Sequence, residues 1–386
     1  MEIRIAQRDD WDAILRLSQE SDSTARSIET WEGNSLQAVL AFDGGQLIGM
    51  LPLEERVWEI GHGDRLNVLW ATGVHVDAAY RGRGIGGQLD TFATKTFADR
   101  FDAFCVFRED ETSPAFNWYR KNGYHRQAHI RAYRLPVVTA DSHSDAARFS
   151  CRHLTTRQEL LDAGPDLLSC FNALRNDWGG YAARTPESWV KAWDYHYYRA
   201  SYSYSVMALV EEDRTTAFAL LGETSMRDGV TRYDILEFAA DAGEAENNLH
   251  AAVLSAARLK GLEEIRMQII SGDPREDWLN RLGYLYRDRS TNILGKVLAP
   301  GRILARLADR QKAAWNWQTE GWGDIKSPGA AGTMAANDAA LTAFCFHRLS
   351  VEHAARAGDV QWLGPGAPPA IPGLPAPWRY FQADYI

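Results

Sequence analysis

The sequence predicts a mixed α/β fold, arranged as two similar domains in tandem with a small α+β region at the end. Three observations predict this arrangement. Runs of alternating apolar and polar residues, typical of strands, are interleaved with longer amphipathic runs typical of helices. A segment at positions 117–124 recurs at positions 277–284. A chain of 386 residues is also longer than one ordinary core allows.

The first part of the chain predicts strands and helices in regular succession. Alternating or apolar runs predict strands at residues 2–6, 37–42, 46–53, 66–77, 101–107 and 129–137. Helical patterns follow Asp9-Asp10, the glycine-rich turn at 82–87, and Ser113. The second and third strands are joined by Asp43-Gly44-Gly45, which predicts a hairpin. Strands interleaved with helices in this order indicate a mixed sheet.

The recurring segment indicates a duplicated domain. NWYRKNGY at residues 117–124 returns as DWLNRLGY at 277–284, and the strands LWATGVHVD and VTRYDILEF also correspond, each before a long helix. The separation of the two copies is far longer than a solenoid repeat. The polar stretch 136–150 has no sustained periodicity and is the expected linker. We therefore predict domains at residues 1–138, 151–298 and 299–386.

The turn Arg81-Gly82-Arg83-Gly84-Ile85-Gly86 follows a predicted strand and precedes a predicted helix. Its glycines allow the backbone to approach a ligand closely and turn its N–H groups towards one point. The helix N-terminus adds unsatisfied donors and a partial positive charge, and the two arginines add donors for phosphate oxygens. The turn therefore predicts a pyrophosphate-binding site, with a solvated glycine loop as the alternative.

The second copy differs where this site would be. Residues 241–246 read DAGEAE, and Leu279 stands at the position of Tyr119. Acidic residues have replaced the basic, glycine-rich turn, and an apolar side chain has replaced a hydroxyl. We therefore expect cofactor binding in the first domain and a structural role for the second.

The segments VHVDAAYRGRGIGGQL and SPAFNWYRKNGY resemble the GNAT acetyltransferase superfamily, and the resemblance covers residues 3–135. It implies that the backbone amides of the 81–86 turn hold the pyrophosphate of acetyl-CoA. It also implies that Val74, His75 and Val76 pair with the pantetheine arm like an added strand. Ser113 lies where the superfamily often has Asn, a position implied to approach this arm.

Two other phosphate-binding folds fit less well. No Gly-Lys-Ser/Thr follows the turn, as a Walker A loop requires. The arginines and the long preceding hairpin suit CoA better than the dinucleotide of a Rossmann fold.

The tandem arrangement resembles the "enhanced intracellular survival" acetyltransferases, which carry two GNAT-like domains and a sterol-carrier-like C-terminal domain. Here residues 299–386 would form that third domain, although they are fewer than the resemblance leads us to expect. The resemblance implies that the chain's own terminal carboxylate, at Ile386, enters the active site of the first domain. Four aromatic residues within the last nine also indicate a packed tail.

Acyl transfer to an amine requires a neutral amine, a polarised thioester and a proton for the departing thiolate. Tyr119 is the expected acid, because a phenol with a pKa of about 10 is protonated at neutral pH. A backbone amide near Val76 is expected to stabilise the tetrahedral oxyanion. The base stays open: the resemblance implies the Ile386 carboxylate, and His75 is the other candidate. If neither group is the base, the remaining candidates are the acidic run Glu109-Asp110-Glu111 and a water chain.

Composition limits the partners. A net charge of −9 argues against nucleic acid and is compatible with a small cationic amine as acceptor. No apolar run approaches the roughly 20 residues that span a bilayer, so no membrane partner is expected. The N-terminus has no signal-peptide pattern, which favours a cytoplasmic location. Four scattered cysteines fit neither disulfides nor a metal site, so we expect buried free thiols and no metal.

Two other functions remain open from the sequence. One is a CoA-binding module or sensor without turnover, and the other is a lipid-carrying or scaffolding protein built around the third domain. The intact 81–86 turn and Tyr119 favour the enzyme. The identity of the amine, and whether the chain forms a homo-oligomer, are not determined by the sequence.

Overall fold

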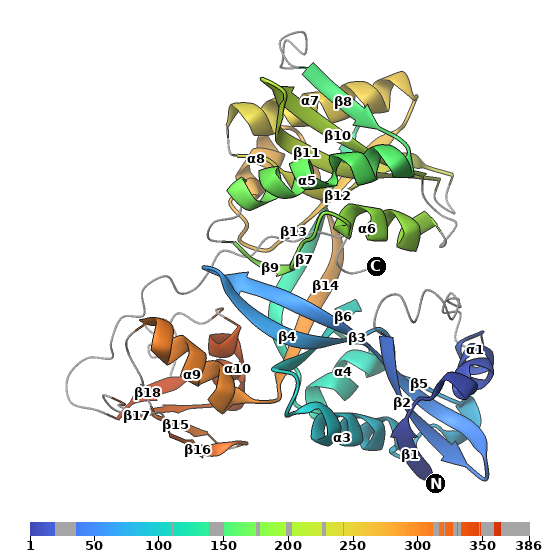
Figure 1. Cartoon of the computed structure of the whole chain (residues 1–386), viewed down its shortest axis with the longest axis vertical. Coiled ribbons are helices and arrows are strands. Elements are labelled where there is room, and N and C mark those ends of the chain that lie inside the picture. Colours follow the sequence, from blue (N-terminus) through green and yellow to red (C-terminus); the bar gives the residue numbers. More distant parts are fainter. Residues whose placement is uncertain are drawn as a thin grey trace. The chain divides into compact units, whose positions relative to one another are not determined.

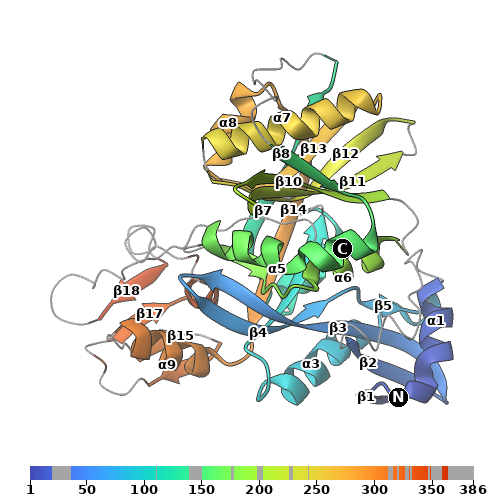
Figure 2. The same cartoon turned by 45° about the horizontal axis from the view of Figure 1, so that its top comes forward.

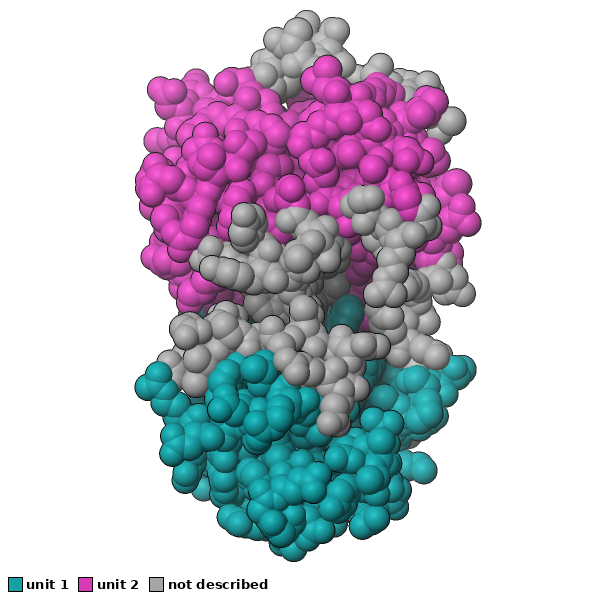
Figure 3. Space-filling view, turned by 90° about the vertical axis from the view of Figure 1, so that its right-hand side faces the viewer, with its two compact units in different colours: residues 1–60, 64–128, 292–376 teal, residues 61–63, 129–291, 377–386 magenta. Residues whose placement is uncertain are grey.

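The structure is a computed structural model, and it describes most of the chain. The described residues are 1–19, 36–109, 111–138, 150–174, 178–197, 203–225, 229–241, 243–311, 316–319, 321–326, 330, 333–346, 348 and 359–363. They fall into two compact units, shown in teal and magenta in Figure 3. Unit 1 comprises residues 1–60, 64–128 and 292–376, and unit 2 comprises residues 61–63, 129–291 and 377–386. The mixed α/β class predicted from the sequence is confirmed.

The sheet of unit 1 has the strand order β1-β2-β3-β4-β6-β14. Its strands are β1 (Glu2–Ile5), β2 (Leu36–Asp43), β3 (Gln46–Gly61), β4 (Asp64–Ala71), β6 (Ala103–Glu109) and the last residues of β14 (Leu285–Val297). β4 and β6 are parallel, whereas β1, β2 and β3 pair antiparallel. The hairpin predicted at Asp43–Gly45 is confirmed: Asp43 pairs with Gln46, and Gly44 and Gly45 have φ of +56° and +84°. A two-residue loop with both φ angles positive favours glycine strongly.

Helices cover both faces of this sheet. α1 (Trp11–Gln19) packs on one face, where Ile14 and Leu17 are buried against β2 and β3. α3 (Ile85–Phe97) and α4 (Pro114–Lys121) lie together on the other face (Figure 1). Four apolar residues of α3 recur every four positions and are buried, namely Ile85, Leu89, Ala93 and Phe97. The helices expected after Asp9-Asp10, the glycine-rich turn and Ser113 are thus confirmed.

The strand predicted at residues 66–77 is interrupted. β4 ends at Ala71, and a separate two-residue strand, β5 (His75–Val76), pairs antiparallel with β3. Gly73 lies between them with φ of +147°, a backbone conformation that L-residues rarely adopt. Beyond the interruption the chain still pairs with β3 but no longer with β6, and this shapes the candidate site described below.

The C-terminal part of unit 1 contains α9 (Pro300–Gln311), α10 (Asp338–Cys345) and a small sheet. This sheet has the order β16-β15-β17-β18, with strands β15 (Asn316–Thr319), β16 (Gly323–Ile325), β17 (Thr333–Ala336) and β18 (Val360–Trp362). An α+β region is therefore present, but its likeness to a sterol carrier is not confirmed.

A buried carboxylate joins this region to the first sheet. Asp102 is 1% exposed and accepts hydrogen bonds from Arg302 Nε (2.9 Å), Arg306 (2.8 Å) and the backbone N–H of Asn67 (2.8 Å). Arg302 also donates to carbonyl groups at the end of α3, including that of Asp99 at 2.8 Å. α9 is therefore held against the C-terminal end of α3 by ionic and backbone bonds.

Unit 2 contains a second mixed sheet, in the order β7-β13-β12-β11-β10-β8. Its strands are the greater part of β7 (His125–Pro136), β8 (Ser150–Leu154), β10 (Ser203–Glu211), β11 (Arg214–Ser225), β12 (Thr231–Ala239) and β13 (Glu264–Ile270). The short strand β9 (Gly179–Ala182) also belongs to the unit. α5 (Arg157–Leu174) and α6 (Ser188–Tyr197) cover one face, and α7 (Glu244–Leu259) with α8 (Arg275–Arg281) covers the other (Figure 2).

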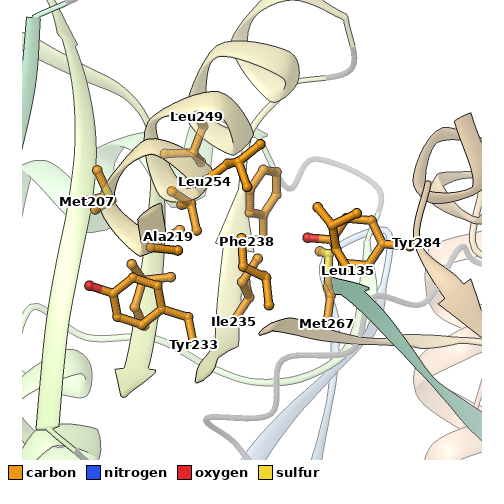
Figure 4. Close-up of a cluster of buried hydrophobic side chains, with 14 of the residues drawn as sticks. Leu135, Met207, Ala219, Tyr233, Ile235, Phe238, Leu249, Leu254, Met267 and Tyr284 are labelled. Carbon is orange, nitrogen blue, oxygen red and sulfur yellow. The ribbon is translucent and has the colours of Figure 1, made fainter. Parts of the chain in front are cut away.

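Alternation along the strands builds a core on each face of this sheet. Tyr233 and Ile235 face α7, together with Leu135 of β7 (Figure 4), whereas Leu236 packs with α5 and α6. Successive residues of β12 thus serve opposite cores, as the two-residue period of a strand requires. All of these side chains are at most 3% exposed.

The duplication is visible in the structure, with one exchange. α4 and α8 are followed by β7 and β14, which begin at the corresponding positions His125 and Leu285 of the two copies. Yet β7, the last strand of the first copy, pairs with β13 in unit 2, and β14 contributes Leu294 to the core of unit 1. The predicted boundaries 1–138, 151–298 and 299–386 describe the repeat in the sequence, whereas each compact unit includes the other copy's last strand.

Three further predictions from the sequence concern the cysteines, the linker with the aromatic tail, and membrane-spanning helices. Cys105, Cys170 and Cys345 are free and buried as expected, but Cys151 is exposed because it lies on β8 at the edge of its sheet. Most of the linker lies outside the described residues, as does the aromatic tail. Among the helices that are described, none has the length and apolar character needed to cross a bilayer.

Candidate functional site

Two neighbouring strands of unit 1 separate at one point. β4 pairs with β6 as far as Ala71, which lies opposite Val106. Beyond Ala71 the chain follows β3: the N–H of Thr72 donates to the carbonyl of Pro52 (3.1 Å), and β5 pairs with β3. β6 meanwhile continues to Glu109. Residues 72–76 and the end of β6 therefore diverge, and an extended ligand can add to a strand edge at such a place.

Tyr119 lies beside this divergence. It belongs to α4, is 1% exposed, and packs edge-on against Trp118 and Tyr124. Its hydroxyl makes no hydrogen bond of standard geometry with the described residues, although the backbone of Val74 is close enough to affect its pKa. A buried polar group without a partner lowers the stability of a protein by about 1–3 kcal/mol. The position of this hydroxyl is therefore better explained by function than by stability.

Burial raises the pKa of Tyr119 to about 12. The Arg108 guanidinium opposes this shift, and the Asp90 carboxylate adds to it. The phenol is therefore fully protonated at neutral pH and has a proton to give. Tyr119 and Val74, both predicted as site residues, are thus brought together by α4 and by the interrupted strand.

Arg108, near the end of β6, faces Tyr119 from the other side. Its guanidinium carbon lies 5.6 Å from the centre of the Tyr119 ring, within the range of a cation–π interaction. Its Nε is buried and has no hydrogen-bond partner among the described residues. The sequence alone does not indicate a role for this residue, because an arginine at the end of an apolar strand looks like an ordinary strand terminus.

The glycine-rich turn has the geometry of an anion site. Gly82 and Gly84 have φ of +76° and +75°, and Gly84 is the N-cap of α3. The N–H of Gln88 donates to the Gly84 carbonyl (3.1 Å) and is the first to close a helical bond. In the described structure, the N–H groups of Ile85 and its two successors thus have no acceptor, as expected for a helix start. These donors and the helix dipole favour a bound phosphate.

The two arginines of this turn brace its backbone. Arg81 Nε donates to the Val76 carbonyl (3.0 Å), and Arg83 donates to the Ala79 carbonyl (3.1 Å) while it stacks on Tyr80 at 4.9 Å. Both arginines are exposed. Their charge is therefore held beside the free amides of the turn, and their side chains also fix its shape.

Two glycines set how closely the helices approach. A Cβ on Gly86 would lie 3.3 Å from the Trp118 ring, and one on Gly49 of β3 would lie 3.1 Å from Ile85. Gly86 therefore allows α3 to pack on α4, so that the turn and Tyr119 belong to one rigid arrangement. This packing role was not foreseen for Gly86.

The other predicted cofactor residues occupy defined positions. Ser113 is the N-cap of α4, where its Oγ accepts from the Phe116 N–H at 3.1 Å. His75 is buried, and its backbone pairs with Met50 of β3. Val74 and Val76 pack against the core of unit 1. Ser113 therefore has a structural role in starting the helix that carries Tyr119.

The candidate bases are only partly described. Glu111 is exposed and bonded to Arg126 at 2.6 Å. Asp110, the side chain of Glu109, and Ile386 lie outside the described residues. No cluster of His, Cys, Asp or Glu that could hold a metal ion occurs in the described part of the chain.

The corresponding position of the second copy carries acidic and apolar side chains. α7 begins at Glu244, and Glu246 in its first turn is buried. Acidic side chains in the first turn offset the positive end of a helix from within the protein. Leu279, which replaces Tyr119, is fully buried in the core of unit 2.

A family model and several solved structures resemble this chain. Residues 2–125 match the family described as an acetyltransferase (GNAT) domain. A GCN5-related N-acetyltransferase from Anabaena variabilis ATCC 29413 is 12% identical, with a TM-score of 0.70, over 98% of this chain and 100% of that chain. Eis1 from Mycobacterium abscessus is 17% identical, with a TM-score of 0.67, over 98% of both chains.

A protein from Enterococcus faecalis V583, described as a conserved protein of unknown function and a probable N-acyltransferase, has a TM-score of 0.71. It is 14% identical over 94% of both chains. No curated protein matches the sequence. At these identities the solved structures establish a shared fold, and the family match concerns residues 2–125.

Proposed function

We propose that this chain, whose residues 2–125 carry an acetyltransferase (GNAT) domain, moves an acetyl group from acetyl-CoA to a primary amine of a small, cationic acceptor. The observation that carries the proposal is the buried, unpartnered Tyr119 hydroxyl next to Val74, where strands β4 and β6 diverge. A thioester lying along this strand edge would bring its sulfur to that hydroxyl.

The turn at 81–86 would hold the CoA pyrophosphate through the amide N–H groups at the start of α3. Arg81 and Arg83 would contribute positive charge and keep the turn in shape. Val74, His75 and Val76 would pair with the pantetheine arm, and Ser113 would lie near it. Acetyl-CoA supplies the activated acyl group, and no metal is required in this scheme.

The reaction would proceed by direct attack. The neutral amine forms a C–N bond to the thioester carbon, and the oxyanion is stabilised by a backbone amide near Val76. When the C–S bond breaks, the thiolate takes the Tyr119 proton. The proton lost from nitrogen goes to a base, for which the Ile386 carboxylate is our first candidate, and the phenol is reprotonated from solvent.

The test combines binding and turnover on the purified full chain. Calorimetry measures CoA binding, and release of free thiol from acetyl-CoA is followed with a panel of polyamines, aminoglycosides and neutral amines. The proposal expects CoA binding and amine-dependent thiol release, faster with cationic amines. CoA binding without turnover on any amine would favour a silent CoA-binding module, and no CoA binding would refute the proposal.

A further inference from the structure

Arg108 and Tyr119 form a pair that the reaction scheme above does not use. Arg108 follows Val106, the last residue of β6 that pairs with β4, by two positions. Because side chains alternate along a strand, Arg108 lies on the same face as Val106, which belongs to the core around α3 and α4. This face presents its guanidinium to the Tyr119 ring at 5.6 Å.

The guanidinium has capacity for a further interaction. Arg108 Nε and the Tyr119 hydroxyl are buried and make no hydrogen bond of standard geometry with the described residues, but the guanidinium is close enough to the hydroxyl to lower its pKa. Asp90 also acts on Tyr119, but Asp90 is engaged by the Tyr124 hydroxyl at 2.9 Å and by Lys296 at 2.6 Å. Arg108 is therefore the cation that can attract a negative charge on the Tyr119 oxygen.

Proton donation by Tyr119 would create such a charge. An alkyl thiol has a pKa of about 8.5. With the pKa of Tyr119 at about 12, a value that already includes the lowering by Arg108, transfer of its proton to a thiolate is unfavourable by a factor of about 3,000, and without this cation it would be more unfavourable. A cation beside the ring lowers this barrier because it attracts the phenolate more strongly than the neutral phenol.

We propose that Arg108 is a positioning residue for acetyl transfer that acts through Tyr119, by stabilising the phenolate formed when the C–S bond breaks and the thiolate takes the phenol proton. The proposal rests on the proposed function. Its chemistry balances within that scheme: the thiolate gains one proton, Tyr119 loses it, and the proton released from the attacking amine restores the phenol through solvent.

A double-mutant cycle separates this role from a structural one. The variants are Arg108→Gln, Tyr119→Phe and the double variant, with kcat measured at saturating acetyl-CoA and amine. We expect Arg108→Gln to lower kcat about 10-fold in the wild-type chain and less than about twofold when Tyr119→Phe is already present. Arg108→Lys keeps the charge and should recover most of the loss.

The control is Arg100→Gln. Arg100 also stacks on a ring, 5.2 Å from the centre of Phe101, but lies beyond the opposite end of α3. It should leave kcat unchanged. If Arg108→Gln does not fold, as judged by its thermal transition, Arg108→Met replaces it in the same cycle.

The outcomes are distinct. An equal loss of kcat with and without the Tyr119 hydroxyl, or no loss in either case, would overturn the role of Arg108. Absence of turnover in the wild-type chain would instead refute the proposed function. A loss confined to the chain that keeps Tyr119, with recovery by Arg108→Lys, would support the proposal.

Discussion

The Tyr124 hydroxyl donates a hydrogen bond of 2.9 Å to the buried carboxylate of Asp90. In the second copy, Tyr284 and His250 hold the corresponding positions, and the hydroxyl lies 3.0 Å from His250 Nε2. The tyrosine is thus kept in both copies, while its partner differs in charge. Asp90 is also bonded to Lys296, whereas His250 is packed between Trp278 and Tyr284.

His250 should make the protein sensitive to acid. Burial lowers the pKa of His250 to about 4, below its ordinary value of 6.5. The unfolded chain therefore binds a proton between pH 6.5 and 4 that the folded chain does not, so stability falls as pH decreases through this window. We expect a loss of about 2 kcal/mol at this site between pH 7 and 5. Urea unfolding at both pH values should show the loss in wild type and not in His250→Gln; an equal loss in both would contradict the assignment.

CoA should bind once per chain, in the first copy. Arg81→Ala with Arg83→Ala should weaken CoA binding about 10- to 100-fold, because charge and loop bracing are both lost. Glu244→Gln with Glu246→Gln, at the matching helix start, should leave affinity unchanged. Calorimetry gives both the affinity and the stoichiometry. Two CoA molecules per chain would show that the second copy has kept a site.

Arg302 should stabilise unit 1 more than its neighbour Arg306 does. Arg302 bonds Asp102 and the carbonyls of Ala98, Asp99 and Phe101, whereas Arg306, within the described part of the chain, bonds only Asp102. Because Arg302 is 36% exposed, we expect Arg302→Ala to cost only about 2 kcal/mol, and Arg306→Ala less. Denaturant unfolding measures both. Equal costs would mean that the carbonyl bonds contribute nothing.

The terminal carboxylate can be tested without changing any side chain. Adding a few residues after Ile386 would move the terminal carboxylate away from Ile386. If that carboxylate handles the proton of the amine, turnover should fall by a factor of about 100 or more, with CoA affinity near normal. Full activity in the extended chain would leave His75, Glu111 and the neighbouring acids as candidates for the base.

The sequence was sufficient for the elements and for the two copies, because alternation, turn glycines and the repeated NWYRKNGY-like motif are local signals. It did not reveal the break at 72–74, since Val74–Val76 continues the apolar pattern and only Gly73 marks the place where pairing with β6 has ended. Nor did it reveal that β7 and β14 exchange sheets, because strand pairing is decided by contacts distant in the sequence.

The candidate site could also be predicted only in part from the sequence. The 81–86 turn and Tyr119 were predicted as site residues because the spacing of their motifs is local. Arg108 and the packing of Gly86 on Trp118 were missed, because each depends on a side chain supplied by another element.

The central claim is that Tyr119 gives a proton to the departing thiolate, and Tyr119→Phe tests it most directly. Phe keeps the ring packing against Trp118 and Tyr124 and removes only the hydroxyl. In an assay limited by chemistry, we predict that kcat falls about 100-fold or more while the Kd for acetyl-CoA changes less than about twofold. An unchanged kcat would contradict the account.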